Sequence, residues 1–150
     1  MGKKFVAIII LAILAAVFMF TSCSGQGEPP EAAIKINSKD IELERGSYQW
    51  TSRYMLSYNT VGTDAASPSQ MAEHIKAVQI NKKSFGLLSF KSHFPPEIHA
   101  YLWKKEDRGK ELTIKNNQLT LPTEKGRHVI EIEAQWQNGD VSYTFVVEVK

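Results

Sequence analysis

The residues of this chain that could bind a metal ion or transfer protons are its histidines, and one short segment combines two of them with a carboxylate. His93, Glu97 and His99 surround the turn His93-Phe-Pro-Pro-Glu97. Imidazole and carboxylate groups are typical zinc ligands, and in a strand that starts at Glu97 the side chains of Glu97 and His99 share a face. We find no fourth ligand on a facing element. We therefore expect solvent-facing strand residues here and predict no metal ion and no cofactor.

The motifs of common hydrolases and nucleotide-binding enzymes are missing from the sequence. There is no Gly-x-Ser-x-Gly, no His-Glu-x-x-His and no glycine-rich phosphate loop. The residues thus assemble no nucleophile with a base, and we predict no catalytic residues and a protein that is not an enzyme. An uncharacterised hydrolase is the less favoured alternative.

Aromatic side chains are the candidates for ligand binding. They are Tyr48, Trp50, Tyr54 and Tyr58 in one group, and Tyr101 and Trp103, beside His99, in a second. An unbroken strand would array the first group on one face, whereas a break at the polar run Thr51-Ser52-Arg53 would not. Such rings can stack on sugars or on a peptide. The favoured interpretation is that they fill a sandwich core, with their polar atoms at its rim.

The N-terminus has the features of a signal peptide. Lys3 and Lys4 precede residues 5–20, sixteen apolar residues without a charge. As a helix these residues would span about 24 Å, short of the ~30 Å hydrocarbon core of a bilayer. That length is typical of a cleaved h-region. The chain's only cysteine, Cys23, follows directly and can form no internal disulfide.

The segment Phe20-Thr-Ser-Cys23 resembles the lipobox of bacterial lipoproteins. The resemblance implies removal of a signal peptide at residues 1–22, a diacylglycerol on the sulfur of Cys23, and often a further fatty acid such as palmitate on the new N-terminus. It places the protein on the extracytoplasmic face of the cell membrane, within the cell envelope. An uncleaved anchor helix and an ordinary signal peptide are the alternatives.

The remaining 128 residues suffice for one domain. We predict a tether at residues 23–32, rich in small and polar residues, and a single domain at 33–150. The chain has 18 Lys and Arg against 16 Asp and Glu, and two of these lysines leave with the signal peptide. A neutral mature protein offers no electrostatic case for nucleic acid as a partner.

The C-terminal segment predicts a β-hairpin with Asn138-Gly139 at the tip of a type I′ turn. The resulting pairs on one face are apolar: Trp136 with Val141, Ala134 with Tyr143, Ile132 with Phe145, and Ile130 with Val147. The opposite face is mostly polar and is predicted to be wet: Gln135 with Ser142, Glu133 with Thr144, and Glu131 with Val146. One buried and one wet face is typical of an antiparallel sheet that covers a core.

Other segments predict further short elements. A second hairpin turns at Asn116-Asn117 and pairs Ile114 with Leu119 and Leu112 with Leu121. Further strands are expected at 34–37, 41–44, 47–50, 53–58, 84–91 and 97–103. Ser67-Pro68-Ser69-Gln70 has the order of an N-cap, a first-turn proline and a capping-box glutamine. With Met71, Ile75 and Val78 on one stripe, it predicts a helix over 67–78.

Many short strands without βαβ alternation favour a sandwich. The run from Leu121 to Phe145, with Gly126, an Ala134-x-Trp136 and a Ser-Tyr143-x-Phe145, resembles the last two strands of immunoglobulin-like domains, and particularly those of small uncharacterised lipoproteins of Gram-positive bacteria. The resemblance implies an all-β, immunoglobulin-like antiparallel β-sandwich, here with one short helix. It also places His128 where these domains have a corner tyrosine. It implies no activity.

These observations predict a membrane-anchored extracytoplasmic lipoprotein that acts as a non-catalytic binding or interaction module. The partners expected are the membrane, through the lipid anchor, and an envelope protein or glycan. An accessory or structural subunit of an envelope complex is the alternative. If the domain has a binding face, its candidate residues are the aromatics Tyr48–Trp50 and Tyr101–Trp103, beside the Ser67–Val78 helix.

Overall fold

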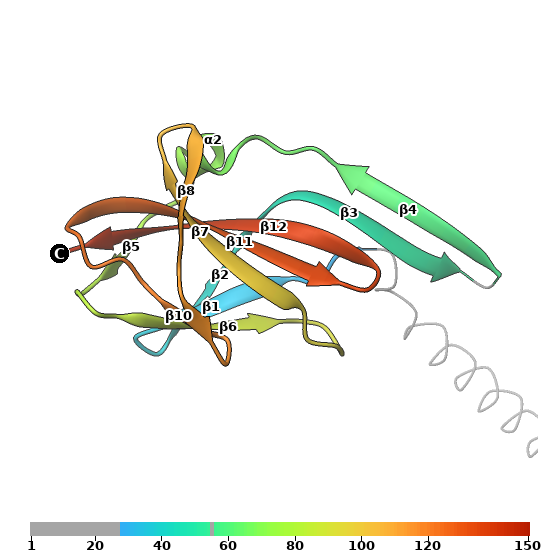
Figure 1. Cartoon of the computed structure of the whole chain (residues 1–150), viewed down its shortest axis with the longest axis horizontal. Helices are drawn as coiled ribbons and strands as arrows, with labels where there is room; N and C mark the ends of the chain where they lie inside the picture. The colour runs from blue at the N-terminus through green and yellow to red at the C-terminus, as the bar shows by residue number, and fades with distance from the viewer. Residues whose placement is uncertain (1–27, 55) are drawn as a thin grey trace, which may run out of the picture.

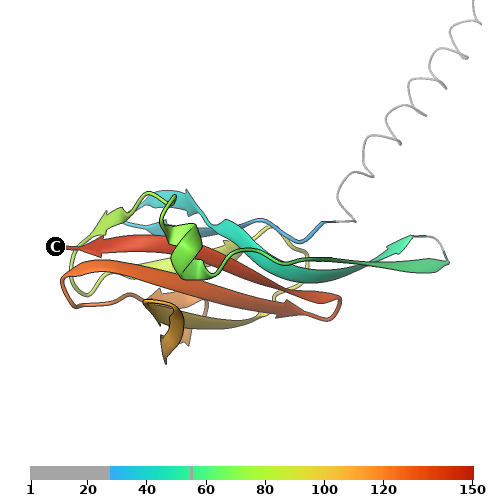
Figure 2. The same cartoon turned by 90° about the horizontal axis from the view of Figure 1, so that it is seen from above.

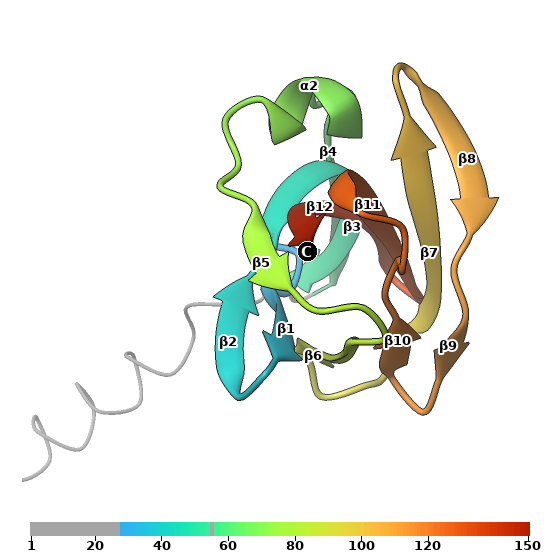
Figure 3. The same cartoon turned by 90° about the vertical axis from the view of Figure 1, so that its left-hand side faces the viewer.

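A computed structural model of the protein describes residues 28–54 and 56–150. Over these residues the chain forms two stacked sheets and one short helix, which confirms the predicted all-β sandwich (Figures 1 and 3). The predicted signal peptide and Cys23 lie outside the described residues. Within the described residues, no helix is long and apolar enough to span a bilayer.

The smaller sheet has five strands in the order β2-β1-β6-β10-β9. They are β1 (Ala32–Ile36), β2 (Lys39–Glu42), β6 (Phe85–Phe90), β9 (Ile114–Lys115) and β10 (Gln118–Thr120).

The larger sheet runs β4-β3-β12-β11-β7-β8, and β5 pairs in parallel with the end of β12. Its strands are β3 (Glu44–Tyr54), β4 (Ser57–Thr63), β5 (Val78–Ile80), β7 (Glu97–Lys104), β8 (Asp107–Glu111), β11 (Gly126–Trp136) and β12 (Gly139–Val149). The helix, α2 (Pro68–Ala72), lies on the face of this sheet that points away from the smaller one (Figure 3).

The core fills the space between the two sheets, because alternate residues of strands such as β1, β11 and β12 are apolar and point inward. Trp136 lies near one end of the core and makes edge-to-face contacts with Trp50 and Phe90, each at a centroid distance of 5.5 Å. The polar atoms of these large side chains are satisfied: Trp136 Nε1 donates to the Phe94 carbonyl at 3.0 Å, and the Tyr143 hydroxyl donates to the Pro30 carbonyl. Burial raises the pKa of Tyr143.

The C-terminal hairpin has the predicted faces and a different register. Trp136 pairs with Gly139 and Ile132 with Tyr143, so the turn consists of Gln137 and Asn138. The shift from the predicted register is two residues, which leaves every side chain on its predicted face. Gly139 serves another purpose than the predicted turn: a Cβ there would overlap the carbonyl oxygen of Gln49 and lie 2.8 Å from the Trp50 ring. Glycine at this position allows β3 to approach β12.

The prediction that the opposite face of this hairpin is wet is wrong at its centre. Glu131, Thr144 and Val146 are buried there. The reason is tertiary: α2 packs over β11 and β12 from one side, and Trp103 and Arg108 cover Glu131 from the other. The outer face of the β11–β12 hairpin is exposed to water only toward the ends of the two strands.

The second hairpin is confirmed at its turn. Asn116 and Asn117 have φ angles of 50° and 62°, as a type I′ turn requires, and Ile114 pairs with Leu119. The predicted pair of Leu112 with Leu121 does not form, because the Leu112 N–H donates instead to the Ala100 carbonyl of β7 at 2.8 Å.

The helix begins as predicted and ends sooner. Ser67 caps it, and Gln70 completes the capping box. The α-helix stops at Ala72, and Val78, predicted to lie on its apolar stripe, belongs to β5. The chain leaves the helix early because β5 must reach the edge of β12.

Strand β3 runs without a break through Thr51-Ser52-Arg53, contrary to the predicted interruption, and the chain then returns as β4. Tyr58 therefore lies on a different strand from Tyr48 and Trp50. Together β3 and β4 form an arm that projects beyond the sandwich (Figure 2).

The domain begins earlier than the predicted boundary at residue 33. Pro29 is buried, the Pro30 carbonyl accepts the Tyr143 hydroxyl, and Glu31 forms an ion pair with Lys91. The described part of the predicted tether is thus packed on the sandwich.

Candidate ligand-binding groove

A groove of about 500 Å³ lies on the outer face of the larger sheet. Helix α2 forms one wall with Ser67, Pro68 and Met71, and Trp103 and Arg108 form the other. Strands β11 and β12 form the floor. The Ser69 hydroxyl donates to the Lys105 carbonyl, so the helix and the β7–β8 turn are joined at one end of the groove.

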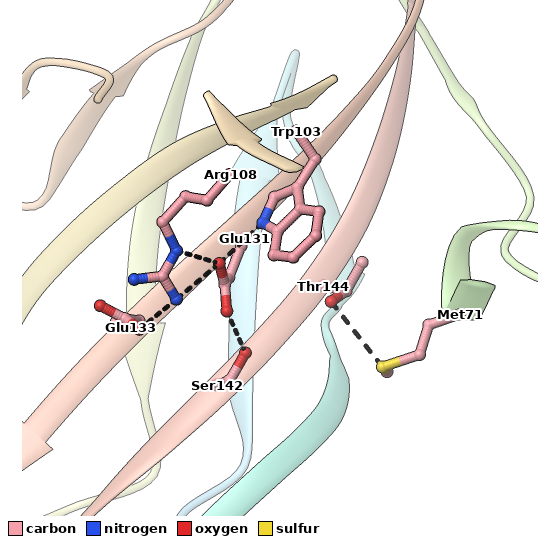
Figure 4. Close-up of polar contacts among 7 residues, drawn as sticks. All are labelled: Met71, Trp103, Arg108, Glu131, Glu133, Ser142 and Thr144. Atoms are coloured by element: carbon pink, nitrogen blue, oxygen red, sulfur yellow. Dashed lines mark hydrogen bonds and ion pairs between the residues drawn. The ribbon is translucent and has the colours of Figure 1, made fainter. Parts of the chain in front are cut away.

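Local sequence and long-range contacts together hold α2 in place. The capping box starts the helix, and Pro68 and Ala72 are buried against the sheet. Arg127 of β11 donates to the Ala72 carbonyl at the end of the helix and, at 3.3 Å, to the Ile75 carbonyl just beyond it. Met71 Sδ lies 3.9 Å from the Thr144 hydroxyl (Figure 4).

Glu131 is the centre of the polar network in the groove (Figure 4). One of its oxygens accepts hydrogen bonds from Trp103 Nε1 at 2.7 Å and from Arg108 Nε at 3.0 Å, and the other accepts the Ser142 hydroxyl at 2.9 Å. Its side chain is 5% exposed. With both oxygens engaged, this carboxylate is suited to fix the indole and the guanidinium.

Glu133 also pairs with Arg108, from a more open position. Its side chain is 40% exposed, against 5% for Glu131. Arg108 therefore bridges a buried and an exposed carboxylate, and its guanidinium carbon lies 4.5 Å from the centroid of the Tyr101 ring. This cation–π contact joins β8 to β7 within the hairpin, and the ion pairs of Arg108 with Glu131 and Glu133 join the hairpin to β11.

His99 lies at the open edge of the same face. Its Nδ1 is 2.8 Å from Glu111 Oε1 and its Nε2 is 3.4 Å from Glu97 Oε1. The hydrogen bond to Glu111 is the main cause that raises the pKa of His99, although partial burial opposes it. The imidazole also stacks on Tyr101 at a centroid distance of 6.4 Å.

The charged residues that line the groove are mostly acidic. The lining contains one cation, Arg108, and three carboxylates, Glu131, Glu133 and Asp140, so its formal charge is negative when His99 is neutral. Such a lining disfavours phosphate-rich polyanions and favours neutral or cationic ligands.

The structure separates the two aromatic pairs that the sequence offered as one binding face. Trp103 lies with α2 in the groove, and Tyr101 is on the same outer face. Trp50 is buried in the core, and Tyr48 packs against the core from the inner face, so this pair follows the favoured core interpretation. Tyr48 and Trp50 lie on the inner face of the larger sheet, which the second sheet covers, so they form no common face with Tyr101 and Trp103.

The histidine segment does not converge on one point. Glu97 and His99 interact, whereas His93 lines a separate hollow at the end of the sandwich. Among residues 28–54 and 56–150, no group of three His, Cys, Asp or Glu side chains is arranged to hold a metal ion.

Sequence reasoning did not identify Arg108, Asp140 or the buried role of Glu131. Alternation placed Glu131 on the outer face correctly. It carried no information on the partners that cover this residue, since Arg108 is 23 residues away in the chain.

Comparisons of the chain with protein-family models, with curated proteins and with solved structures give no match.

Proposed function

We propose that this protein is a lipid-anchored lipoprotein of the cell envelope that binds a neutral or cationic glycan, without turnover, in the groove between α2 and the β7–β8 hairpin. The observation that carries the proposal is the lining of the groove: one oriented indole, Trp103, beside a floor of carboxylate, amide and hydroxyl groups.

The lining matches the two surfaces of a sugar ring. A pyranose has an apolar C–H face, which packs on an aromatic ring, and a rim of hydroxyls, which pairs with planar polar side chains. Glu131 holds the indole through its Nε1, so the ring loses little freedom on binding. Gln135 and Asp140 are exposed on the floor and supply hydrogen-bonding groups at the rim.

The engagement of Glu131 and His99 supports a binding role over a catalytic role for these two residues. Acid–base chemistry requires a carboxylate or imidazole that can exchange a proton with the substrate. Glu131 is occupied by three donors and His99 is bonded to two carboxylates. A binding module requires only that these groups stay in place.

The lipoprotein and immunoglobulin-like parts of the proposal rest on the resemblances at Phe20–Cys23 and Leu121–Phe145. One contact supports the second. His128 Nε2 lies 2.7 Å from the Glu124 carbonyl, four residues upstream at the start of β11. A corner tyrosine in immunoglobulin-like domains makes a bond of this kind to the preceding backbone.

The test is titration calorimetry of the mature protein, in detergent, with oligosaccharides prepared from cell-wall glycan, N-acetylated or with free amines. We expect measurable binding, stronger for the free amines because of the acidic lining. Asp140→Asn should reduce that preference, and Trp103→Ala should weaken binding about tenfold or more.

The matched control is Phe85→Ala, which removes an aromatic ring that is 51% exposed on the other sheet and should leave binding unchanged. Loss of binding in both alanine variants, or no binding by the unaltered protein, would contradict the glycan proposal. Reproducible hydrolysis of the oligosaccharides would instead assign the protein to the hydrolases.

A further inference from the structure

The β3–β4 arm extends past the rest of the sandwich at one end (Figure 1). The last residue of β3 bonded to the β11–β12 turn is Thr51, whose N–H donates to the Asn138 carbonyl at 2.7 Å. Residues 52–54 continue the strand and pair with β4 alone among the described residues. At ~3.3 Å per residue the arm projects about 10 Å. A hydrogen bond of 2.8 Å between the hydroxyls of Thr51 and Thr60 ties the two strands at its base.

Exposed apolar side chains gather on this arm. Leu56 is 95% exposed and Tyr58 is 73% exposed, and Val61 lies farther along β4. Strand β4 is exposed at every position, so neither sheet covers these side chains. Exposed apolar side chains that gather in one place mark a contact site, whereas single ones do not.

The N-terminal end of the described chain lies at the same end of the molecule. Glu28 Oε2 is 3.8 Å from Arg45 Nη1, and Glu28 lines one hollow together with Arg53 and Tyr58 of the arm. Figure 2 shows the arm and the first described residues toward the end opposite to the C-terminus. The segment that would be attached to the membrane therefore begins beside the arm.

The length of that segment decides what the arm can reach. From Cys23 to Glu28 the chain has five peptide links, which span at most about 18 Å when fully extended. The projection of the arm, about 10 Å, is shorter than this reach. A domain anchored at Cys23 can therefore place the arm tip on the bilayer without straining the tether. The same holds for an uncleaved anchor that ends just before Cys23.

We propose that the β3–β4 arm is a foot that rests on the phospholipid surface of the membrane to which the protein is anchored. This inference rests on the membrane anchor of the proposed function. Leu56 would enter the top of the acyl region and Tyr58 would lie at headgroup level, where tyrosine is enriched in membrane proteins. Arg53, exposed on the arm, would face the lipid phosphates.

One leucine and one tyrosine give weak membrane affinity by themselves. The anchor makes the contact intramolecular, so a weak interaction is populated at the high effective concentration that a short tether provides. The consequence is a fixed orientation of the domain. The foot would hold the sandwich with its C-terminal end away from the bilayer, and the groove beside α2 would stay accessible.

The test uses the mature, membrane-purified protein reconstituted in vesicles of phosphatidylethanolamine and phosphatidylglycerol. A spin label is attached at Asn59→Cys on the arm, which keeps Leu56 and Tyr58, or at Lys125→Cys. Lys125 precedes Gly126, which pairs with Val149 at the opposite end of the sandwich. We expect vesicles to make the arm label less accessible to a water-soluble nickel relaxant and more accessible to oxygen, with no change at residue 125.

Leu56→Glu should raise the nickel accessibility of the arm label to a value close to that of the label at residue 125, because a carboxylate opposes insertion. Leu87→Glu is the matched control, since Leu87 is 52% exposed on the other sheet. Mass spectrometry of the same sample reports the acyl group on Cys23. An acylated, vesicle-bound protein whose arm label stays fully water-accessible would overturn the foot and leave the anchor standing. A protein that the vesicles do not retain would overturn both.

Discussion

At the scale of single residues, exposure separates two carboxylates that share one arginine. Glu131 and Glu133 both pair with Arg108, and only Glu131 is buried. A buried acceptor that loses its charge weakens three hydrogen bonds that water cannot replace, whereas an exposed one exchanges its partner for water. The ion pair of Arg108 with Glu131 should therefore contribute more to stability than the ion pair of Arg108 with Glu133.

We therefore predict that Glu131→Gln lowers the free energy of unfolding by about 1–3 kcal/mol and that Glu133→Gln lowers it by at most about 1 kcal/mol. Urea denaturation of the two variants beside the unaltered protein measures both values. Equal losses would show that the face over Glu131 is open to water.

His99 gives a pH dependence whose sign follows from its contacts. The hydrogen bond to Glu111 raises its pKa above the ordinary value of 6.5. The paired imidazolium therefore stabilises the fold fully below about pH 6.5, and this contribution disappears as the pH rises through the raised pKa of the folded state.

We expect NMR titration of the His99 ring to give a pKa above 6.5 in the unaltered protein and a lower one in Glu111→Gln. The unaltered protein should also lose slightly more stability than the variant between about pH 6 and about pH 8. A His99 pKa at or below 6.5, unchanged by the substitution, would contradict the contact.

At the scale of elements, close approach of strands sets the register of the C-terminal hairpin. Asn138-Gly139 has the composition of a type I′ turn. Neither residue has a positive φ angle, however, whereas Asn116 and Asn117 in the second hairpin both do. Gly139 pairs with Trp50 instead, where the backbone of β3 leaves no room for a side chain. Packing against a third strand therefore outweighs the preference of the local turn.

This explanation predicts that Gly139→Ala destabilises the protein by about 1–3 kcal/mol, because the added methyl group must push β3 away. The matched control is Gly62→Ala on β4, where the nearest atom to an added Cβ would be the Tyr48 carbonyl oxygen at 3.6 Å, an ordinary contact. Thermal unfolding should show that Gly62→Ala changes the free energy of unfolding by less than about 1 kcal/mol. A Gly139→Ala variant as stable as the Gly62→Ala variant would contradict the crowding argument.

At the scale of the whole molecule, the proposed membrane contact and the proposed glycan site lie on separate surfaces. The arm and the first described residues lie at one end, the C-terminus lies at the other, and the groove opens on the side that carries α2 (Figures 1 and 2). A protein built in this way would contact the membrane and a glycan simultaneously through separate surfaces.

The anchor itself is open to a direct test. We predict that cells expressing the unaltered chain contain a protein that partitions into the detergent phase and has acyl mass on Cys23. Cys23→Ala should release the protein or halt its processing, because two or three acyl chains meet the requirement for stable membrane attachment. A mature N-terminus at any other residue would contradict the lipoprotein assignment.

The sequence by itself determined the features that depend on neighbouring residues. The alternation of apolar residues in β11 and β12 predicted which side chains face the core, since side-chain direction has a period of two. The turn at Asn116-Asn117 and the cap at Ser67 were also predicted, because their hydrogen bonds and backbone angles lie within a few residues.

Only the tertiary structure decided which parts of those elements are covered. Glu131 is buried because Trp103 and Arg108 reach it from another hairpin, and Trp50 belongs to the core because a second sheet covers the inner face. The projection of the β3–β4 arm depends on where its pairing with β12 ends. Each of these outcomes is set by contacts between segments distant in the chain, and the local pattern of residues carries no information about such contacts.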